Sequence, residues 1–368
     1  MNHPVFAYFE RFHGLVPSGY HANFLGVKTR NGFAAGMVAA LGHQLPDGGY
    51  VRGDYPGFDE EYFEWIDLLE AVLAARGVFT MIELGAGYGR WLVNAAVAAA
   101  QRRTGDLRIK LVGVEAEPTH FAWLKQHFED NGLDPAEHVL IEAAIDATDG
   151  MVDFYVGKAD EWYGQRIADH GDTERPVNQV RAITLKGILT GLESVDLIDL
   201  DIEGAELVVL SSAIDELDRK VKRVHIGTHA RSIERGLRTL FREHSWYKRN
   251  DYEVGGSELT QWGPISFNNG VQTWINPRLQ SIEPTQAEMH WLQWALHSSE
   301  IRYGRLQDEM HAPEAAPERV QEDARLRAAL EAAREAQNRI AAMETSKFWK
   351  LRRLWFRLKR RVGLGENE

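Results

Sequence analysis

Three glycines recur at every second position in the segment Met-Ile-Glu-Leu-Gly-Ala-Gly-Tyr-Gly-Arg at residues 81–90. Gly85, Gly87 and Gly89 follow an apolar run that predicts a buried strand, and an alanine-rich helix is predicted next. Glycine allows positive φ angles and a close approach of the backbone to a ligand. The free N–H groups of the helix start attract electronegative groups. The pattern therefore predicts a nucleotide-like cofactor at this loop.

The spacing and one carboxylate distinguish two cofactor classes. Dinucleotide sites carry Gly-x-Gly-x-x-Gly, which brings a pyrophosphate to the helix start. Here the spacing is Gly-x-Gly-x-Gly, and Glu83 precedes it at the strand end. A carboxylate there would repel a pyrophosphate but suits an ammonium group. S-adenosylmethionine carries an ammonium and a sulfonium group and no phosphate, so it is the predicted cofactor, with a nicotinamide dinucleotide as the alternative.

Two further carboxylates follow the next predicted strands and complete the expected cofactor site. Glu115 ends the second strand, where it can accept hydrogen bonds from both ribose hydroxyls. This chemistry is the same for both cofactor classes, so Glu115 does not separate them. Asp146 follows the third strand. Either Asp146 or Glu142 is expected to accept a hydrogen bond from the adenine amino group.

Candidate catalytic groups lie after two later strands. Transfer of a group to an alcohol requires removal of its proton, and a histidine with a near-neutral pKa is the usual base. His229 is the predicted base; its alternative role is to cap the following helix or fill the core. Asp201 is expected to contact the acceptor, to act as base, or to bind Mg²⁺ together with Glu203. Glu203 alternatively caps the helix that begins after it.

Aromatic side chains in two loops are candidates for acceptor binding. Trp162 and Tyr163 lie between predicted strands, where they either form a platform for a sugar ring or anchor their loop. Tyr50 and Tyr55 have the same two alternatives in the N-terminal segment.

Short apolar runs and helical patterns alternate from residue 59 onward. Strands are expected at 78–84, 109–115, 138–144, 151–156, 197–202 and 221–227. Helices are expected at 59–76, with Asp59 as its N-cap, and at 90–103, 119–131, 205–217 and 231–243. This alternation predicts an α/β fold with a Rossmann-like, mostly parallel sheet. Runs at 264–267 and 271–275 around Asn269 and Gly270 predict an antiparallel hairpin that closes it.

The hexapeptide Asp-Ile-Glu-Gly-Ala-Glu at 201–206 resembles the signature of FkbM-type methyltransferases. Segments 144–155, 224–229 and 270–277 are also similar to this family, and the resemblance spans about residues 60–280. It implies a class I methyltransferase sheet and S-adenosylmethionine-dependent O-methylation, often of sugar or polyketide-type hydroxyls. The family usually has a lysine where Asp199 stands and a glutamate where His225 stands.

The prediction that follows is an O-methyltransferase acting on a hydroxyl of a saccharide, glycan or glycolipid. An NAD(P)-dependent oxidoreductase and a non-catalytic scaffold on the same fold stay open as alternatives. The expected organisation is an N-terminal lid or substrate segment at 1–57 and the methyltransferase domain at 58–280. The C-terminal helical extension consists of a helical segment at 281–311, a linker with a coiled-coil-like helix at 312–345 and a basic amphipathic tail at 346–368.

The C-terminal extension suggests two kinds of partner. The seam of the helix at 318–343 is compatible with a homo-oligomer. Residues 346–362 contain no acid and place apolar side chains at helical spacing between Lys and Arg. This pattern is typical of an interfacial membrane anchor. The tail is therefore expected either to attach to the inner membrane or to dock on an acidic protein surface.

Composition excludes several other classes. The 368 residues include no cysteine, which rules out a disulfide framework and a thiolate metal site. The net charge of −12 argues against a nucleic-acid partner, which needs a basic face. No apolar run reaches the ~18 residues of a transmembrane helix, and no leader pattern begins the chain. A cytoplasmic protein is expected.

Overall fold

The computed structural model describes residues 2–40, 42–102, 107–161, 163–168, 176–260 and 262–282. The chain divides into two units at residue 282, and only the first, Met1–Ile282, contains described residues. The predicted coiled-coil-like helix, the basic tail and nearly all of the helical segment at 281–311 lie outside them.

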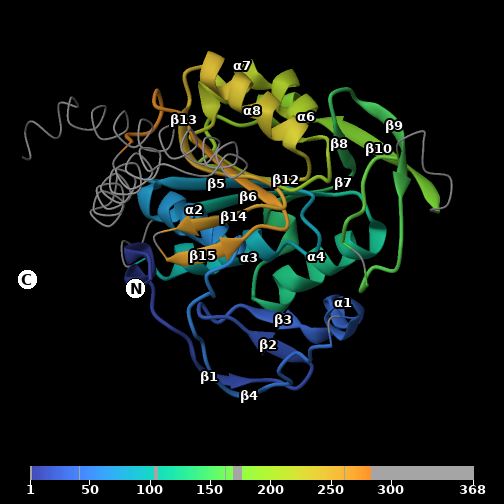
Figure 1. Cartoon of the computed structure of the whole chain (residues 1–368). Helices are drawn as coiled ribbons and strands as arrows, with labels where there is room; N and C mark the ends of the chain where they lie inside the picture. Colours follow the sequence, from blue (N-terminus) through green and yellow to red (C-terminus); the bar gives the residue numbers. More distant parts are fainter. Residues whose placement is uncertain are drawn as a thin grey trace, which may run out of the picture. The chain divides into compact units, whose positions relative to one another are not determined.

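A seven-stranded sheet with the order β13-β16-β12-β11-β5-β6-β7 forms the centre of the first unit (Figure 1). Its strands are β5 (Val78–Leu84), β6 (Arg108–Glu115), β7 (Val139–Glu142), β11 (Leu197–Leu200), β12 (Arg223–Thr228), β13 (Tyr247–Tyr252) and β16 (Gly270–Ile275). β16 runs antiparallel to both of its neighbours, whereas the other strands run parallel to one another. The predicted mostly parallel α/β sheet is confirmed.

Helices cover both faces of this sheet, as crossover connections require. One face carries α2 (Glu61–Ala74), α3 (Arg90–Ala100) and α4 (Pro118–Asp130), and the other carries α5 (Leu185–Thr190), α6 (Glu206–Ser212), α7 (Ile214–Lys220) and α8 (Arg231–Glu243) (Figure 1). Each layer encloses its own apolar core against the sheet. The strands are therefore buried on both sides, which explains their continuous apolar runs.

The predicted closing hairpin is wrong in its pairing. β15 (Gly263–Ser266) pairs with β14 (Ser257–Thr260), not with β16. Every residue of β16 is buried, which suits a strand between β12 and β13 in the main sheet. Pro264 in β15 lacks a backbone donor, and only one residue of that strand is buried, so β15 suits a small outlying hairpin. The antiparallel pair that closes the sheet is β13 with β16.

Three element boundaries also differ from expectation. The strand expected at 138–144 divides: β7 ends at Glu142, and β8 (Ala144–Asp146) joins a separate sheet with β10 (Val177–Thr184) and β9 (Gly150–Tyr155). The helix expected at 205–217 divides into α6 and α7 at Ala213. Asp59 is not the N-cap of α2, because the helix begins at Glu61 and its N-cap position is Glu60.

The N-terminal segment packs on the outer side of α3 and α4 (Figure 1). Its elements are two 3₁₀ turns (Pro4–Tyr8 and Asn31–Phe33), β1 (His13–Val16), β2 (Tyr20–Ala22), β3 (Lys28–Arg30), α1 (Ala35–Ala40) and β4 (Gly49–Arg52). Arg30 forms two hydrogen bonds of 2.6 and 2.8 Å to Asp130 of α4. The backbone N–H of Met37 donates to the carbonyl of Asp160, so the segment also contacts the loop beside the glycine turn. A lid role for the segment stays a prediction.

Candidate active site

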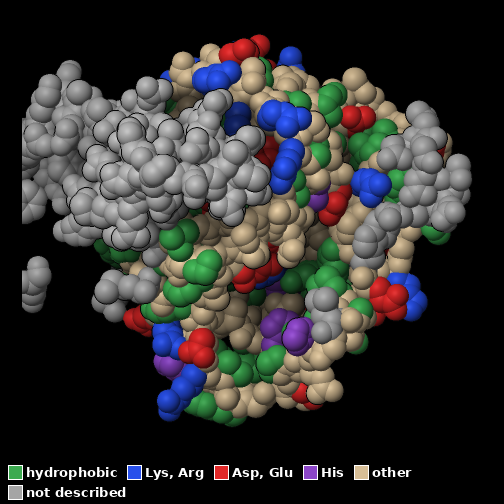
Figure 2. All heavy atoms as spheres, viewed as in Figure 1, with side chains coloured by type: hydrophobic (Ala, Val, Ile, Leu, Met, Phe, Trp, Pro, Cys, Tyr) green, Lys and Arg blue, Asp and Glu red, His purple; other side chains and the backbone are tan. Residues whose placement is uncertain are grey.

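A cleft lies at the carboxyl ends of β5 and β11, where the strand order of the sheet reverses. Open α/β sheets bind ligands at this switch point. The cleft contains about 530 Å³ of space, part of it open to solvent. Its lining residues come from several elements: Gly85, Gly87, Val114, Glu115, Ala116, His120, Ala143, Ala144, Ile145, Phe154, Tyr163, Gln165, Ile167, Asp201 and Ile202. Figure 2 shows acidic and histidine side chains gathered around a hollow near the middle of one face of the molecule.

The glycine turn adopts the conformation that its sequence predicts. Gly85, Gly87 and Gly89 have φ angles of 76°, 54° and 71°, a region that favours glycine. A Cβ atom added at Gly85 would overlap the carbonyl oxygen of Asp201. The missing side chain thus brings the β5 turn directly against the β11 turn, and the two turns together form one wall of the cleft.

Replacing Gly85 with alanine is expected to damage both stability and ligand binding. The added Cβ must push the Asp201 backbone away, in addition to a strain of about 1–3 kcal/mol for the positive φ. Urea unfolding measures the loss of stability. Gly77→Ala is the matched control, because Gly77 also has positive φ (69°) but nothing lies within 4 Å of its added Cβ. Equal losses in the two variants would contradict the close approach argued here.

Glu83 lies behind the turn and not in the cleft. Its carboxylate accepts hydrogen bonds from the backbone N–H groups of Trp91 (3.4 Å) and Leu92 (3.0 Å), so it caps α3. Burial raises the pKa of Glu83 well above its usual value, and nearby Asp199 raises it further. The structure therefore places Glu83 close to, but outside, the lining where a cofactor ammonium group was expected to lie.

Glu115 lines the cleft at the end of β6, as its position in the sequence predicts. Its two carboxylate oxygens accept hydrogen bonds from the N–H groups of Gly87 and Glu117, each 2.7 Å long. Burial raises the pKa of Glu115 to about 7, although these backbone donors partly offset the effect. The carboxyl group is thus held in the cleft wall, next to the glycine turn.

The other predicted contact residues are distributed differently. Tyr163 lines the cleft and stacks on His120 with 4.3 Å between ring centroids, so it lies on the glycine-turn side. Trp162 lies outside the described residues. Asp146 is half-buried just beyond the lining residue Ile145, and its carboxylate accepts a hydrogen bond from its neighbour Ala147.

His229 lies in a group of acidic side chains, one of which, Asp201, also lines the cleft. Its Nδ1 is 2.7 Å from Glu206, and its Nε2 is 3.2 Å from Asp201 and 3.4 Å from Glu203. Burial lowers the pKa of His229, but the contacts with Asp201, Glu206 and Glu203 outweigh it and raise the pKa to about 10. His229 is therefore protonated at neutral pH in the free protein, contrary to the near-neutral pKa expected of a base.

Glu206 is a candidate site residue that the predictions from the sequence did not include. It ends the hexapeptide and begins α6, yet it is fully buried because it turns back to His229 and to the N–H of Gly204. Glu203 precedes that glycine with a φ of 55°, a strained value for a residue with a side chain. The hexapeptide thus forms a tight turn that directs three carboxylates toward one imidazole.

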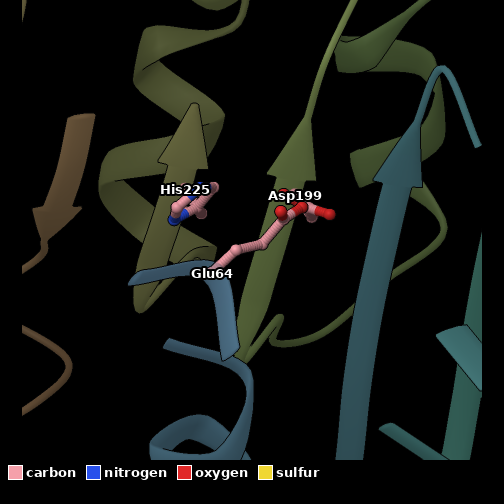
Figure 3. A group of neighbouring side chains, drawn as sticks. All are labelled: Glu64, Asp199 and His225. Carbon is pink, nitrogen blue, oxygen red and sulfur yellow. The ribbon is translucent and has the colours of Figure 1, made fainter. Parts of the chain in front are cut away.

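A second polar cluster lies within the sheet. Glu64 extends from α2 to Asp199 on β11, and His225 lies beside them on β12 (Figure 3). Burial raises the pKa of Asp199 to about 6. Asp199 and His225 are directly opposite in the parallel register. The two positions at which the sequence resemblance predicted a departure are thus neighbours in space.

Comparisons with known proteins agree with this geometry. Residues 83–253 match the family model of the methyltransferase FkbM domain. A curated protein of Jannaschia sp. (strain CCS1), described as "Putative methyltransferase", is 30% identical over 246 residues, covering 64% of this chain and 85% of that protein. The chain belongs to the FkbM methyltransferase family.

Solved structures that align with this chain have low sequence identity and low TM-scores. A methyltransferase FkbM from Methylobacillus flagellatus KT is 12% identical with a TM-score of 0.35, covering 59% of this chain and 55% of that one. A precorrin-6y C5,15-methyltransferase from Geobacter metallireducens GS-15 is 13% identical with a TM-score of 0.33, covering 57% of this chain and 86% of that one. The family assignment rests on the sequence matches alone.

No helix among the described residues combines the length and the apolar character needed to cross a membrane.

Proposed function

We propose that this FkbM-family methyltransferase transfers the methyl group of S-adenosylmethionine to a hydroxyl oxygen of a saccharide. The observation that supports the cofactor most strongly is the charge of the cleft. Its described lining includes the carboxyl groups of Glu115 and Asp201 but no lysine or arginine. A dinucleotide pyrophosphate would be poorly stabilised there, whereas a cationic, phosphate-free nucleoside suits it.

Each part of the cofactor has a suitable neighbour in the cleft. Glu115 would accept hydrogen bonds from the ribose hydroxyls, and Asp146 at the rim would accept one from the adenine amino group. The carboxylate of Asp201 would lie near the cationic end, beside the glycine turn. Once bound, S-adenosylmethionine supplies an electrophilic methyl group on a positively charged sulfur.

The transfer is an in-line displacement at the methyl carbon. The acceptor oxygen would take the methyl group that the bound cofactor supplies, and the carbon–sulfur bond would break with its electron pair left on sulfur. Orientation of the two reactants contributes roughly 7–11 kcal/mol to lowering the barrier. The hydroxyl proton passes to a base, for which His229 and Asp201 are the candidates next to the cleft.

Glu206 would position His229 by accepting the Nδ1–H, which directs Nε2 toward the acceptor. Because three carboxylates keep His229 protonated in the free protein, it can act as base only after a positive charge enters the site. The sulfonium of the cofactor is one such charge. Magnesium at Asp201 and Glu203, predicted from the sequence, would be another.

A methyl-transfer assay with a labelled donor tests the proposed function. The full chain is incubated with labelled S-adenosylmethionine and a library of glycans. We expect label to appear as an alkali-stable O-methyl ether on a saccharide. Label on none of the glycans but on a small phenol or a polyketide hydroxyl would contradict the saccharide part, and no transfer to any acceptor would favour the scaffold alternative.

We also propose that the basic tail at 346–362 attaches the enzyme to an anionic membrane surface. Each Lys or Arg near such a surface contributes about 1 kcal/mol of attraction. The full chain is expected to float with anionic liposomes, and a chain that ends at Glu344 is expected to stay at the bottom of the gradient. Equal flotation of both chains would contradict this role, and flotation with neutral liposomes would exclude its electrostatic basis.

A further inference from the structure

The group formed by Asp201, Glu203 and His229 resembles a set of metal ligands in its geometry. One ligand atom from each of these side chains lies within 4.8 Å of the others. The Nε2 of His229 is 3.2 Å from one carboxylate and 3.4 Å from the other. Two ligands at right angles, each about 2.1 Å from an ion, are separated by ~3 Å. The observed separations therefore need little adjustment to enclose one ion.

The charge of this group is unbalanced. Asp201, Glu203 and Glu206 place three carboxyl groups around the one imidazole of His229, and the nearby cation Arg166 acts on Glu203. Nε2 of His229 is shielded from solvent and has no hydrogen-bond partner among the described residues. Nε2 thus faces two carboxylates, at 3.2 and 3.4 Å, without a well-directed hydrogen bond to either, which is an arrangement that a shared cation would bridge.

Glu206 supplies the support that metal-bound histidines typically have. It is fully buried and lies 2.7 Å from Nδ1 of His229, which fixes the ring orientation and leaves Nε2 as the outward ligand. A carboxylate behind a ligating histidine also increases the basicity of the ring. The strained backbone of Glu203 is explained if its carboxylate must turn toward the same point.

We propose that Asp201, Glu203 and His229 together bind one divalent transition-metal ion of the Mn²⁺ type. Carboxylates suit Mg²⁺, Ca²⁺ and Mn²⁺, whereas an imidazole nitrogen favours transition metals, and Mn²⁺ satisfies both. The sequence predicted Mg²⁺ at Asp201 and Glu203; the structure brings Nε2 of His229 close to both carboxylates, which favours a transition metal.

The ion would leave coordination positions open toward solvent. The side chain of Asp201 is 53% exposed, and those of Glu203 and His229 are 26% and 14% exposed. Because Asp201 also lines the cleft, an acceptor could reach the ion from there. With Nε2 bound to the ion, His229 would be a metal ligand in place of the base proposed above. An acceptor with two neighbouring oxygens, such as a vicinal diol of a sugar, would bind best. This last step rests on the proposed function, but metal binding itself does not.

The buried cluster of Glu64, Asp199 and His225 is a weaker candidate. Nδ1 of His225 is 2.8 Å from Asp67, and Asp199 is only 4% exposed, so no acceptor could reach an ion there. The carboxyl groups of Glu64 and Asp199 in that cluster also interact with each other, so one of them must hold a proton.

Titration of the full chain with Mn²⁺, after removal of bound metal by a chelator, tests the proposal without cofactor or acceptor. Electron paramagnetic resonance reports the free Mn²⁺. We expect one saturable ion per chain. Asp201→Asn and His229→Ala should each weaken binding at least tenfold, and Glu206→Gln should weaken it about 10- to 100-fold through its effect on His229.

Asp215→Asn is the matched control, because Asp215 is an exposed carboxylate on α7 outside the group; its affinity for Mn²⁺ should equal that of the wild type. Thermal melting verifies that each variant is folded. If His229→Ala is unfolded, the Mn²⁺ affinity of Asp201→Asn tests the site in its place. Absence of saturable binding, or equal affinity in wild type and Asp201→Asn, would overturn the metal site. A chain that binds S-adenosylhomocysteine but no Mn²⁺ loses only this inference, whereas one that binds Mn²⁺ but no S-adenosylhomocysteine loses the proposed cofactor.

Discussion

Replacement of Glu115 with glutamine is expected to weaken the binding of S-adenosylhomocysteine by about 10- to 100-fold at pH 8. Hydrogen bonds to a charged group contribute about 1.5–3 kcal/mol each, and about 1.4 kcal/mol corresponds to a factor of ten in affinity. Glutamine preserves the shape of the side chain but removes its charge and one acceptor oxygen. Isothermal titration calorimetry measures the change.

The affinity of the wild-type protein should also depend on pH. Burial raises the pKa of Glu115 to about 7, so the carboxylate that accepts the ribose hydrogen bonds is present above pH 7 and is lost below it. Affinity should therefore be constant at high pH and fall by up to about tenfold per unit as the pH drops below 7. Glu115→Gln should show no such fall. Asp153→Asn, which removes an exposed carboxylate next to the lining residue Phe154, should behave as the wild type. A pH profile shared by wild type and Glu115→Gln would remove Glu115 from the site.

Replacement of His229 with alanine is expected to lower turnover by about 10²- to 10⁴-fold, the usual contribution of a positioned acid or base. Affinity for S-adenosylhomocysteine should change little, because His229 does not line the cofactor cleft. Steady-state rates with labelled donor, combined with calorimetry, separate these two quantities.

His244→Ala is the matched control for that variant. His244 also pairs through Nδ1 with a carboxylate, 2.7 Å from Asp218, but it lies at the end of α8. Its replacement should leave turnover unchanged. Glu206→Gln should lower turnover while calorimetry still shows full cofactor affinity, since Glu206 acts through His229. Normal turnover in His229→Ala would exclude this histidine from both catalysis and acceptor binding.

Local patterns in the sequence predicted the parts of the fold that short-range chemistry decides. The glycine turn was predicted from its own ten residues, because positive φ angles and the strand before it depend on neighbours in sequence. α8 begins and ends where its apolar spacing indicates. Glu115 and Asp201 were found because the carboxyl ends of parallel strands meet at one edge of a sheet.

Pairings between distant segments could not be predicted from such local patterns. Asn269 and Gly270 are typical of a hairpin, yet β15 pairs with β14 because the apolar β16 is needed inside the main sheet. The role of Glu206 depends on His229, 23 positions away, and no spacing rule relates the first turn of a helix to the end of the next strand. Gln165 lines the cleft from a loop whose course the sequence does not specify, whereas His120 lines it from the first turn of α4.

The most direct test of the central claim, that the glycine-turn cleft binds a cationic and phosphate-free nucleoside, is calorimetric titration of the full chain with S-adenosylhomocysteine and, separately, with NADH. We predict saturable binding of S-adenosylhomocysteine at one site per chain, weakened by Glu115→Gln, and no binding of NADH. Saturable binding of NADH that Glu115→Gln weakens, with no heat from S-adenosylhomocysteine, would contradict the account.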